Sequence, residues 1–297
     1  MRRKTTAGEV GFQICLYLFF GIFTLSCLYP FYYLFINTVS ANDLSAAGEI
    51  KFYPRGIHFG NYVKVLAISG LSHAAVVSIY RTVCGTLLTV ASSAFLGYLF
   101  TKNEMWGRRI WYRFIIVTMY FSAGLIPWYI TMNNLHLTNN YLAYILPTII
   151  TPFNIILVKT FIEAIPPALE ESAAMDGAGY LRCFGSIMVP LIMPILATIT
   201  IFSAVNQWNS FVDTAFLMTN TKYFTLQFLL WRYLNESSSL AALIRSSPDM
   251  AASVANMQTP TSVRMTVTMI VVLPILIVYP FFQRFFVKGI LIGAVKG

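Results

Sequence analysis

Long apolar stretches without a charged residue constrain this chain more than any other feature. Six windows contain no Asp, Glu, Lys or Arg, and they cover residues 12–38, 82–100, 114–132, 141–158, 191–212 and 265–283. A helix of roughly 20 apolar residues spans a hydrocarbon layer about 30 Å thick, and a helix satisfies its own backbone hydrogen bonds in lipid. The windows lack the alternating polarity of membrane barrel strands. The sequence therefore predicts an all-α polytopic membrane protein in which residues 1–297 form a single domain with six transmembrane helices.

Composition and the placement of basic residues support a membrane protein of defined orientation. Of the 297 residues, 57% are hydrophobic and only 10% are charged, a balance typical of membrane proteins. The basic residues that flank the windows are Arg2, Arg3 and Lys4, then Lys102, Arg108, Arg109 and Arg113, then Arg284, Lys288 and Lys296. Because Lys and Arg mark cytoplasmic connections, both termini are expected in the cytoplasm. The basic residues form no stripe with stacking aromatics, so no nucleic-acid partner is expected.

Other residue types point away from an enzyme or a metal protein. The four cysteines and three histidines are scattered through the chain without metal-ligand spacing. The dipeptide Gly-Lys, which ends a phosphate-binding loop, occurs nowhere. We therefore expect no catalytic residue, no metal and no bound cofactor in this chain.

The connection over residues 214–264 is the longest and is expected outside the membrane. Residues 224–234 are predicted to form a short amphipathic helix at the membrane surface, and residues 237–261 are predicted to form an exposed loop. A passive connector is one interpretation. Long loops in compact domains are usually functional, which favours contact with an external partner.

The cytoplasmic segment 165–190 carries the most informative pattern. Pro166 and Pro167 suit the entry to a helix, and Glu170 and Glu171 then complement the positive end of its dipole. The dipeptide Asp176-Gly177 supplies a residue that tolerates positive φ where this helix must end. A second short helix is predicted over residues 180–189, followed by Pro190. The pattern predicts a helix–turn–helix knuckle, although a short interfacial linker would also explain the prolines.

At these residues the chain resembles the "EAA" loop of ABC importer permeases. The family pattern is Glu-Ala-Ala, three residues, Gly, nine residues, Ile, one residue and Leu-Pro. Here it reads Glu171-Ser172-Ala173, then Gly177, then Ile187, Val189 and Pro190, with Ser172 and Val189 as the two departures. The flanks Leu169-Glu170-Glu171 and Asp176-Gly177-Ala178 resemble the carbohydrate-importing, maltose-type branch. The C-terminal run 288–297 is similar to that of permeases for complex oligosaccharides, such as alginate or pectin fragments.

The resemblance implies a permease subunit that forms half of the path for a carbohydrate of the oligosaccharide class in a bacterial cell membrane. It implies contact with an ATPase through a coupling helix made by Glu170, Glu171, Ala173, Ala174, Asp176, Gly177 and Pro190, and through C-terminal residues Gly293, Lys296 and Gly297. The expected partners are a second permease subunit, two copies of a cytoplasmic ATPase that binds ATP and Mg, an extracytoplasmic solute-binding protein and membrane lipid. An ABC permease for another solute remains an alternative.

The substrate path is expected near the densest polar cluster of the windows: Asn206, Trp208, Asn209, Phe211 and Asp213. Amides facing hydrocarbon are costly, so these side chains should face protein or water. Continuous helical spacing would place Asn206, Asn209 and Asp213 on one face, with Trp208 offering a ring to a sugar. Hydrogen bonding between helices is an equally good explanation.

A secondary transporter driven by an ion gradient is the main rival class. Ion coupling commonly uses ionisable residues within spans, and the six windows contain no Asp, Glu, Lys or Arg. This absence counts against the rival.

Overall fold

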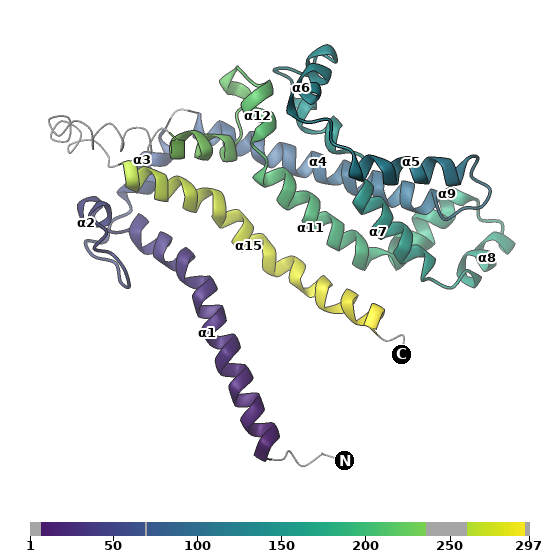
Figure 1. Cartoon of the computed structure of the whole chain (residues 1–297), viewed down its shortest axis with the longest axis horizontal. Coiled ribbons are helices and arrows are strands. Elements are labelled where there is room, and N and C mark those ends of the chain that lie inside the picture. Colours follow the sequence, from purple (N-terminus) through teal and green to yellow (C-terminus); the bar gives the residue numbers. More distant parts are fainter. Residues whose placement is uncertain (1–6, 69, 236–259, 295–297) are drawn as a thin grey trace. The chain divides into compact units, whose positions relative to one another are not determined.

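The computed structural model describes residues 7–68, 70–235 and 260–294, and over these ranges the chain is helical and has no strand (Figure 1). The expectation of an all-α protein is therefore confirmed for the described chain. The longer helices are α1 (Ala7–Thr38), α4 (Leu71–Leu99), α5 (Arg108–Tyr120), α6 (Leu125–Asn134), α7 (Pro152–Glu163), α8 (Ala168–Met175), α11 (Met193–Asn209) and α15 (Pro260–Ala294). The shorter ones are α2 (Asn42–Ala46), α3 (Gly60–Leu66), η1 (Tyr141–Tyr144), η2 (Leu146–Thr148), α9 (Tyr180–Arg182), η3 (Cys183–Met188), α10 (Val189–Leu191), α12 (Val212–Leu217) and η4 (Thr221–Tyr223).

Among the described helices, three are single helices long and apolar enough to cross a membrane: α1, α4 and the first part of α15. If each of two bent helix pairs counts as one span, the described helices offer up to five candidate membrane spans. One pair joins 141–148 to α7 at 43°, and the other joins 180–191 to α11 at 80°. The predicted span 114–132 is not one helix, because α5 ends at Tyr120 and α6 begins only at Leu125, after Gly124 with a φ of 84°.

Two other predicted spans have different boundaries in the structure. The second helix begins at Leu71, well before residue 82, because the charge of Arg81 is accommodated inside the helix bundle. The predicted span 141–158 is divided between 3-10 turns and α7, and Pro152 starts α7 because it has no N–H to donate to the preceding turn. A charge-free window is therefore a poor guide to helix ends where a charge is paired.

The chain divides into two compact units, of which the first contains residues 1–68 and 233–270. Its interior lies around the end of α1, where Asn37 is fully buried. The Asn37 amide donates to the Ile50 carbonyl at 3.3 Å and accepts from the Ser45 hydroxyl at 2.8 Å. The most apolar stretch of α1 is not buried within its own unit.

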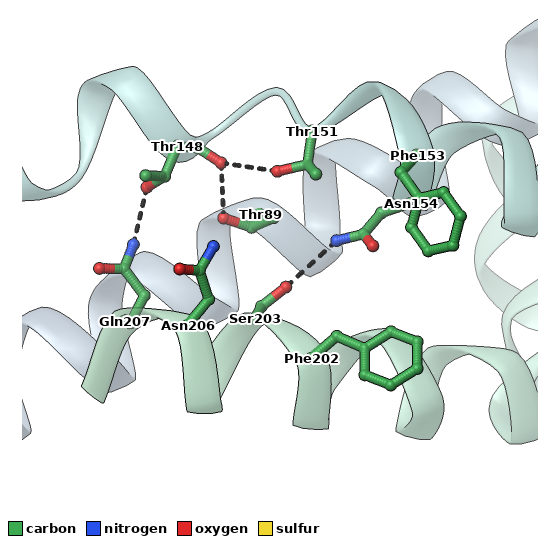
Figure 2. A pocket seen from close by; sticks show the side chains of 9 residues that line it. All are labelled: Thr89, Thr148, Thr151, Phe153, Asn154, Phe202, Ser203, Asn206 and Gln207. Carbon is green, nitrogen blue, oxygen red and sulfur yellow. Dashed lines mark hydrogen bonds between the residues drawn. The ribbon is translucent and has the colours of Figure 1, made fainter. Parts of the chain in front are cut away.

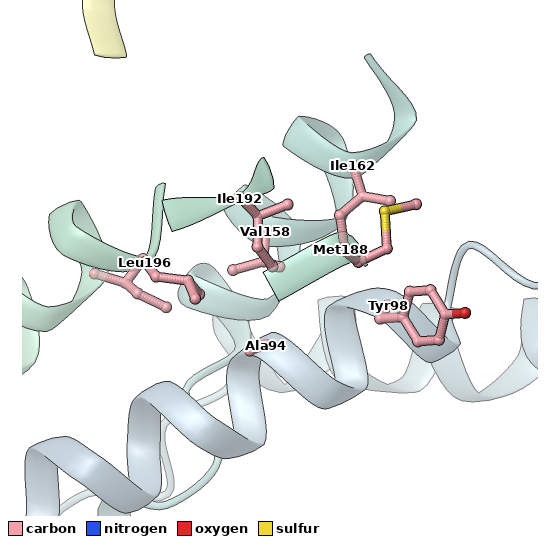
Figure 3. Close-up of a cluster of buried hydrophobic side chains, with 8 residues drawn as sticks. Ala94, Tyr98, Val158, Ile162, Met188, Ile192 and Leu196 are labelled. Atoms are coloured by element: carbon pink, nitrogen blue, oxygen red, sulfur yellow. The ribbon is translucent and has the colours of Figure 1, made fainter. Parts of the chain in front are cut away.

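The second unit contains residues 69–232 and 271–297 and is organised around α4, α7 and α11. These three helices enclose a core of buried side chains shown in Figure 3: Ala94, Tyr98, Val158, Ile162, Met188, Ile192, Leu196 and Ile199. Gly97 lets α4 approach α7 closely, since a Cβ there would lie 2.7 Å from the Val158 side chain. Because lipid tails are as apolar as these side chains, close van der Waals packing and hydrogen bonds between helices hold the three helices together.

The first half of the long 214–264 connection is structured. Residues 226–235 are helical, in agreement with the predicted short helix. Leu226 and Leu229 are buried, and the Leu226 amide donates to the Ser78 hydroxyl of α4 at 2.9 Å. The start of this helix therefore packs against protein. The loop predicted over 237–261 lies mostly outside the described residues.

Candidate functional site

The knuckle predicted over residues 165–190 begins with helix α8, which starts directly after Pro167. Helix α8 ends in a Schellman motif: the Gly177 amide donates to the Ala174 carbonyl at 3.0 Å, and the Ala178 amide donates to the Ala173 carbonyl at 2.9 Å. Gly177 has a φ of 80°, the left-handed region in which a side chain is strained. The helix stop therefore lies where the Asp176-Gly177 pair predicted it.

The second half of the knuckle is a helical run from α9 through η3 to α10. Its middle, Cys183–Met188, is a π-helix, and Pro190 follows in α10. Because proline cannot donate a backbone hydrogen bond, the regular ladder is interrupted here. The run then bends by 80° into α11, so the knuckle projects at an angle from the core helices of its unit.

The predicted coupling residues divide between an exposed surface and a contact with α4. Glu171, Ala174, Asp176, Gly177 and Pro190 are exposed, whereas Ala173 is buried beneath them. The exposed set offers two carboxylates and small side chains to a protein that binds this surface.

Glu170 has a different environment from the other predicted coupling residues. Its carboxylate forms an ion pair with Lys102 and accepts a hydrogen bond from the Tyr98 hydroxyl at 2.7 Å. The Lys102 ammonium also lies over the Tyr98 ring, 4.2 Å from its centre. Tyr98 belongs to α4 and Lys102 follows its end, so Glu170 ties the knuckle to α4.

A polar pocket of about 220 Å³ lies farther along the same bundle, and Figure 2 shows its lining. Its walls come from α4, from the 148–154 segment and from α11: Thr89, Thr148, Thr151, Phe153, Asn154, Phe202, Ser203, Asn206 and Gln207. Hydroxyl and amide groups line one part, and the rings of Phe153 and Phe202 line the other (Figure 2). We name this cavity the polar pocket.

A buried charge network adjoins the polar pocket at Gln207. The Arg81 guanidinium, 1% exposed, donates to both Asp213 carboxylate oxygens at 2.6 and 3.0 Å. It also donates to the Gln207 side-chain oxygen at 3.1 and 3.2 Å and to the Ser210 carbonyl at 3.2 Å. These five bonds equal the number of N–H groups on an arginine side chain. The Tyr144 ring lies 4.5 Å from the guanidinium carbon.

The residues predicted to line the substrate path do not share one helical face. Helix α11 ends at Asn209 and Ser210 is extended, so the chain changes direction before Asp213. Asn206 lines the polar pocket. The Trp208 indole donates to the Val271 carbonyl of α15 at 3.0 Å and lines a separate, apolar cavity.

Of the three remaining path residues, Asn209 is exposed at the end of α11, and the other two are engaged by other parts of the chain. Asp213 is held by Arg81, and the Phe211 ring stacks on Trp231 at 5.6 Å. Hydrogen bonding between helices, the alternative interpretation, therefore describes Trp208 and Asp213 better than a role in the path.

Sequence reasoning missed most of the polar pocket. Thr89, Thr148 and Asn154 lie in apolar windows, where an isolated hydroxyl or amide gives a weak signal. Arg81 lies just before the second charge-free window and was not among the predicted site residues. One signal could have been detected in the sequence. Arg81 directly precedes the window 82–100 and Asp213 directly follows the window 191–212, so the two opposite charges could pair.

The C-terminal residues predicted to contact an ATPase are only partly described. Gly293 lies near the end of α15. Lys296 and Gly297 fall outside the described residues.

Comparisons with known proteins agree with this arrangement. The family model of the binding-protein-dependent transport system inner membrane component matches residues 90–292. The polygalacturonan/rhamnogalacturonan transport system permease protein YtcP of Bacillus subtilis is 31% identical over 96% of this chain and 98% of its own length. The arabinooligosaccharides transport system permease protein AraQ of the same organism is 26% identical over 96% of each chain. A chain in the crystal structure of a bacterial ABC transporter that imports the acidic polysaccharide alginate superposes with a TM-score of 0.83 at 28% identity, covering 96% of this chain and 99% of that one.

Proposed function

Because this chain belongs to the family of inner membrane components of binding-protein-dependent transport systems, we propose that it forms one half of the translocation path of an oligosaccharide importer. The observation that carries the proposal is the near full-length match, in sequence and fold, to permeases named for oligo- and polysaccharides. The polar pocket among α4, α7 and α11 is consistent with it, since a hydrophilic cargo needs hydrogen-bonding groups within the membrane.

The proposed topology has six crossings with both termini in the cytoplasm. The distribution of Lys and Arg supports it, and residues 133–140 contain neither. In this topology α5 and α6 together make the third crossing as a broken helix. Such a break is tolerated where the freed backbone groups meet protein or water.

The proposed energy source is a separate ATPase that docks on the knuckle. The exposed surface of α8, with Glu171 and Asp176 beside small residues, suits a groove lined by basic or amide groups. Closure of two ATPase subunits around ATP and Mg would then move α8. The Glu170–Lys102 ion pair and the Glu170–Tyr98 hydrogen bond offer a direct connection from α8 to α4. A second permease subunit and an extracytoplasmic solute-binding protein complete the proposed assembly.

Uptake by cells that lack this gene tests the proposal. The panel contains radiolabelled oligogalacturonides, arabino-oligosaccharides, a dipeptide and an amino acid, each measured with and without the wild-type gene restored. We expect restoration to raise the uptake of at least one saccharide by tenfold or more and to leave the other solutes unchanged. Restored uptake of the peptide or amino acid alone would refute the carbohydrate assignment.

A further inference from the structure

The relatives named for polygalacturonan and for arabino-oligosaccharides differ in the charge of their sugars, because polygalacturonan is a uronic acid polymer and arabinose carries no ionisable group. Taking the proposed function as given, we propose that the polar pocket binds an uncharged saccharide unit and excludes a carboxylate.

The lining of the polar pocket contains no charged side chain. Its polar groups are hydroxyls and amides from four residue types, and its two remaining residues are phenylalanines. A carboxylate that leaves water without a counter-ion loses far more solvation energy than a hydroxyl that finds one hydrogen-bond partner. The pocket therefore offers what sugar hydroxyls need and lacks what a uronate needs.

The cation next to the polar pocket is already neutralised. Arg81 reaches the pocket only through Gln207, and its five hydrogen bonds all go to Gln207, Ser210 and Asp213. Asp213 binds it in a two-oxygen arrangement, the strongest geometry for this pair. A uronate in the pocket would have to displace Asp213, which would leave that carboxylate largely buried and unpaired.

The pocket keeps hydrogen-bonding capacity for a ligand. Within the described chain, the Asn206 side-chain amide makes no hydrogen bond, so both its donor and its acceptor are free. The Asn154 amide nitrogen donates to Ser203 at 3.2 Å, which leaves the Asn154 oxygen and the Ser203 hydroxyl proton available. Figure 2 shows Asn154 facing Ser203 and Asn206 across the pocket, with the Phe153 and Phe202 rings at one end, where they suit the apolar face of a sugar ring.

The size of the polar pocket matches a short stretch of cargo. Its volume of about 220 Å³ is below the roughly 300–1,000 Å³ of pockets for drug-sized ligands. We therefore assign it one saccharide unit of an oligosaccharide and place the other units beyond this cavity.

Charge exclusion can be measured directly with cysteine reagents. In the assembled complex, Cys15, Cys27, Cys84 and Cys183 are replaced by Ser, and Asn206→Cys is introduced. A matched control is Asn133→Cys, an exposed position near the end of α6 and away from the knuckle. Each variant reacts with neutral methyl methanethiosulfonate and with the anionic 2-sulfonatoethyl reagent, and the anionic-to-neutral rate ratio is compared.

We expect the anionic-to-neutral ratio at Asn206→Cys to be at least tenfold below the ratio at Asn133→Cys. A pocket that attracts anions would give an equal or higher ratio at Asn206→Cys, and this result would overturn the inference. The comparison requires no knowledge of the natural cargo.

Protection by saccharides gives the second measurement. Labelling of Asn206→Cys by the neutral reagent is repeated without the solute-binding protein, so that its own specificity does not enter. The added probes are an oligogalacturonide as the free acid, the same oligogalacturonide fully methyl-esterified, and an arabino-oligosaccharide of equal length. We expect at least one uncharged probe to slow labelling fivefold or more, and the free acid to slow it less than twofold.

Stronger protection by the free acid, or protection by no probe in a complex that imports saccharides, would overturn the inference and leave the proposed function intact. A complex that imports no saccharide would refute the proposed function instead.

Discussion

At the scale of single residues, the least expected feature is a buried arginine in a chain whose apolar windows carry no charge. Arg81 is tolerated in α4 because Asp213, Gln207 and the Ser210 carbonyl together satisfy its guanidinium. This pairing also corrects the argument against ion coupling, since charge-free windows do not make a charge-free bundle. A fully paired arginine has no spare capacity to exchange an ion, so the family assignment stands on other evidence.

Breaking the Arg81–Asp213 pair on one side should cost more than removing both charges. Asp213→Asn leaves a buried guanidinium without its counter-ion, and we expect the free energy of unfolding to fall by about 3–5 kcal/mol. Arg81→Met combined with Asp213→Leu removes the charges together and should cost less than Asp213→Asn alone. Thermal unfolding of the purified complex measures the order of the two variants.

An ion pair whose carboxylate is exposed supplies the control for this comparison. Lys159 and Glu163 lie one helical turn apart at 2.6 Å, and Glu163→Gln should cost no more than about 0.5 kcal/mol. If the double replacement at positions 81 and 213 lowered the thermal midpoint more than Asp213→Asn does, the charges would not be the main contribution. The network would then stabilise the protein through its hydrogen bonds to the break between α11 and α12.

At the scale of helices, close packing in the second unit depends on glycine, which has no side chain. A Cβ at Gly97 would lie 2.7 Å from Val158 Cγ1, so Gly97→Ala should destabilise the complex by about 1–3 kcal/mol through overpacking. Gly185, in the π-helix, has nothing within 4 Å of such a Cβ, and Gly185→Ala serves as the control.

Relief of the collision between position 97 and Val158 separates overpacking from other effects. Val158→Ala alone creates a cavity and is destabilising. In the Gly97→Ala background it also removes the 2.7 Å contact with Cγ1, although the Val158 Cβ stays at 2.9 Å, so it should cost less there than in the wild type. Thermal midpoints of the four variants give the coupling between the two positions. Strict additivity would show that the backbone has moved aside.

The knuckle allows a sharper test, because two glycines near its turn differ in conformation. Gly177 has a φ of 80°, whereas Gly179 has a φ of −72°. Gly177→Val strains the backbone by about 1–3 kcal/mol and should abolish transport while membrane insertion stays normal. Gly179→Ala meets no strain and should transport at wild-type rates. Uptake and immunoblots of membrane fractions measure both effects, and wild-type uptake by Gly177→Val would contradict a coupling role for this turn.

The contrast between these elements shows what could be predicted from the sequence. The stop at Gly177 depends on a few neighbouring residues, and local rules for prolines, acidic residues and glycine were enough to place it. The end of α11 and the burial of Arg81 depend on partners 126–132 residues away along the chain. The polar pocket likewise needs three helices to meet, so only Asn206 of its lining was among the predicted site residues.

At the scale of the whole molecule, the membrane topology follows from the order of crossings, and it sets which side each functional segment faces. The polar loop 133–140 should lie outside and the knuckle inside, because an odd number of crossings separates them. A single bent crossing, 141–148 with α7, connects the two segments. If that bent pair were a re-entrant loop, the two segments would lie on the same side.

Impermeant cysteine labelling distinguishes these two arrangements. Asn133→Cys and Met175→Cys are made separately in a chain without its four natural cysteines, in cells that lack the ATPase so that α8 stays uncovered. Both positions are exposed in the chain. We expect a membrane-impermeant maleimide to label Asn133→Cys in intact cells and to label Met175→Cys only after permeabilisation. Labelling of both in intact cells would place the knuckle outside, where no ATPase can reach it, and both the crossing and the docking surface would then have to be reassigned.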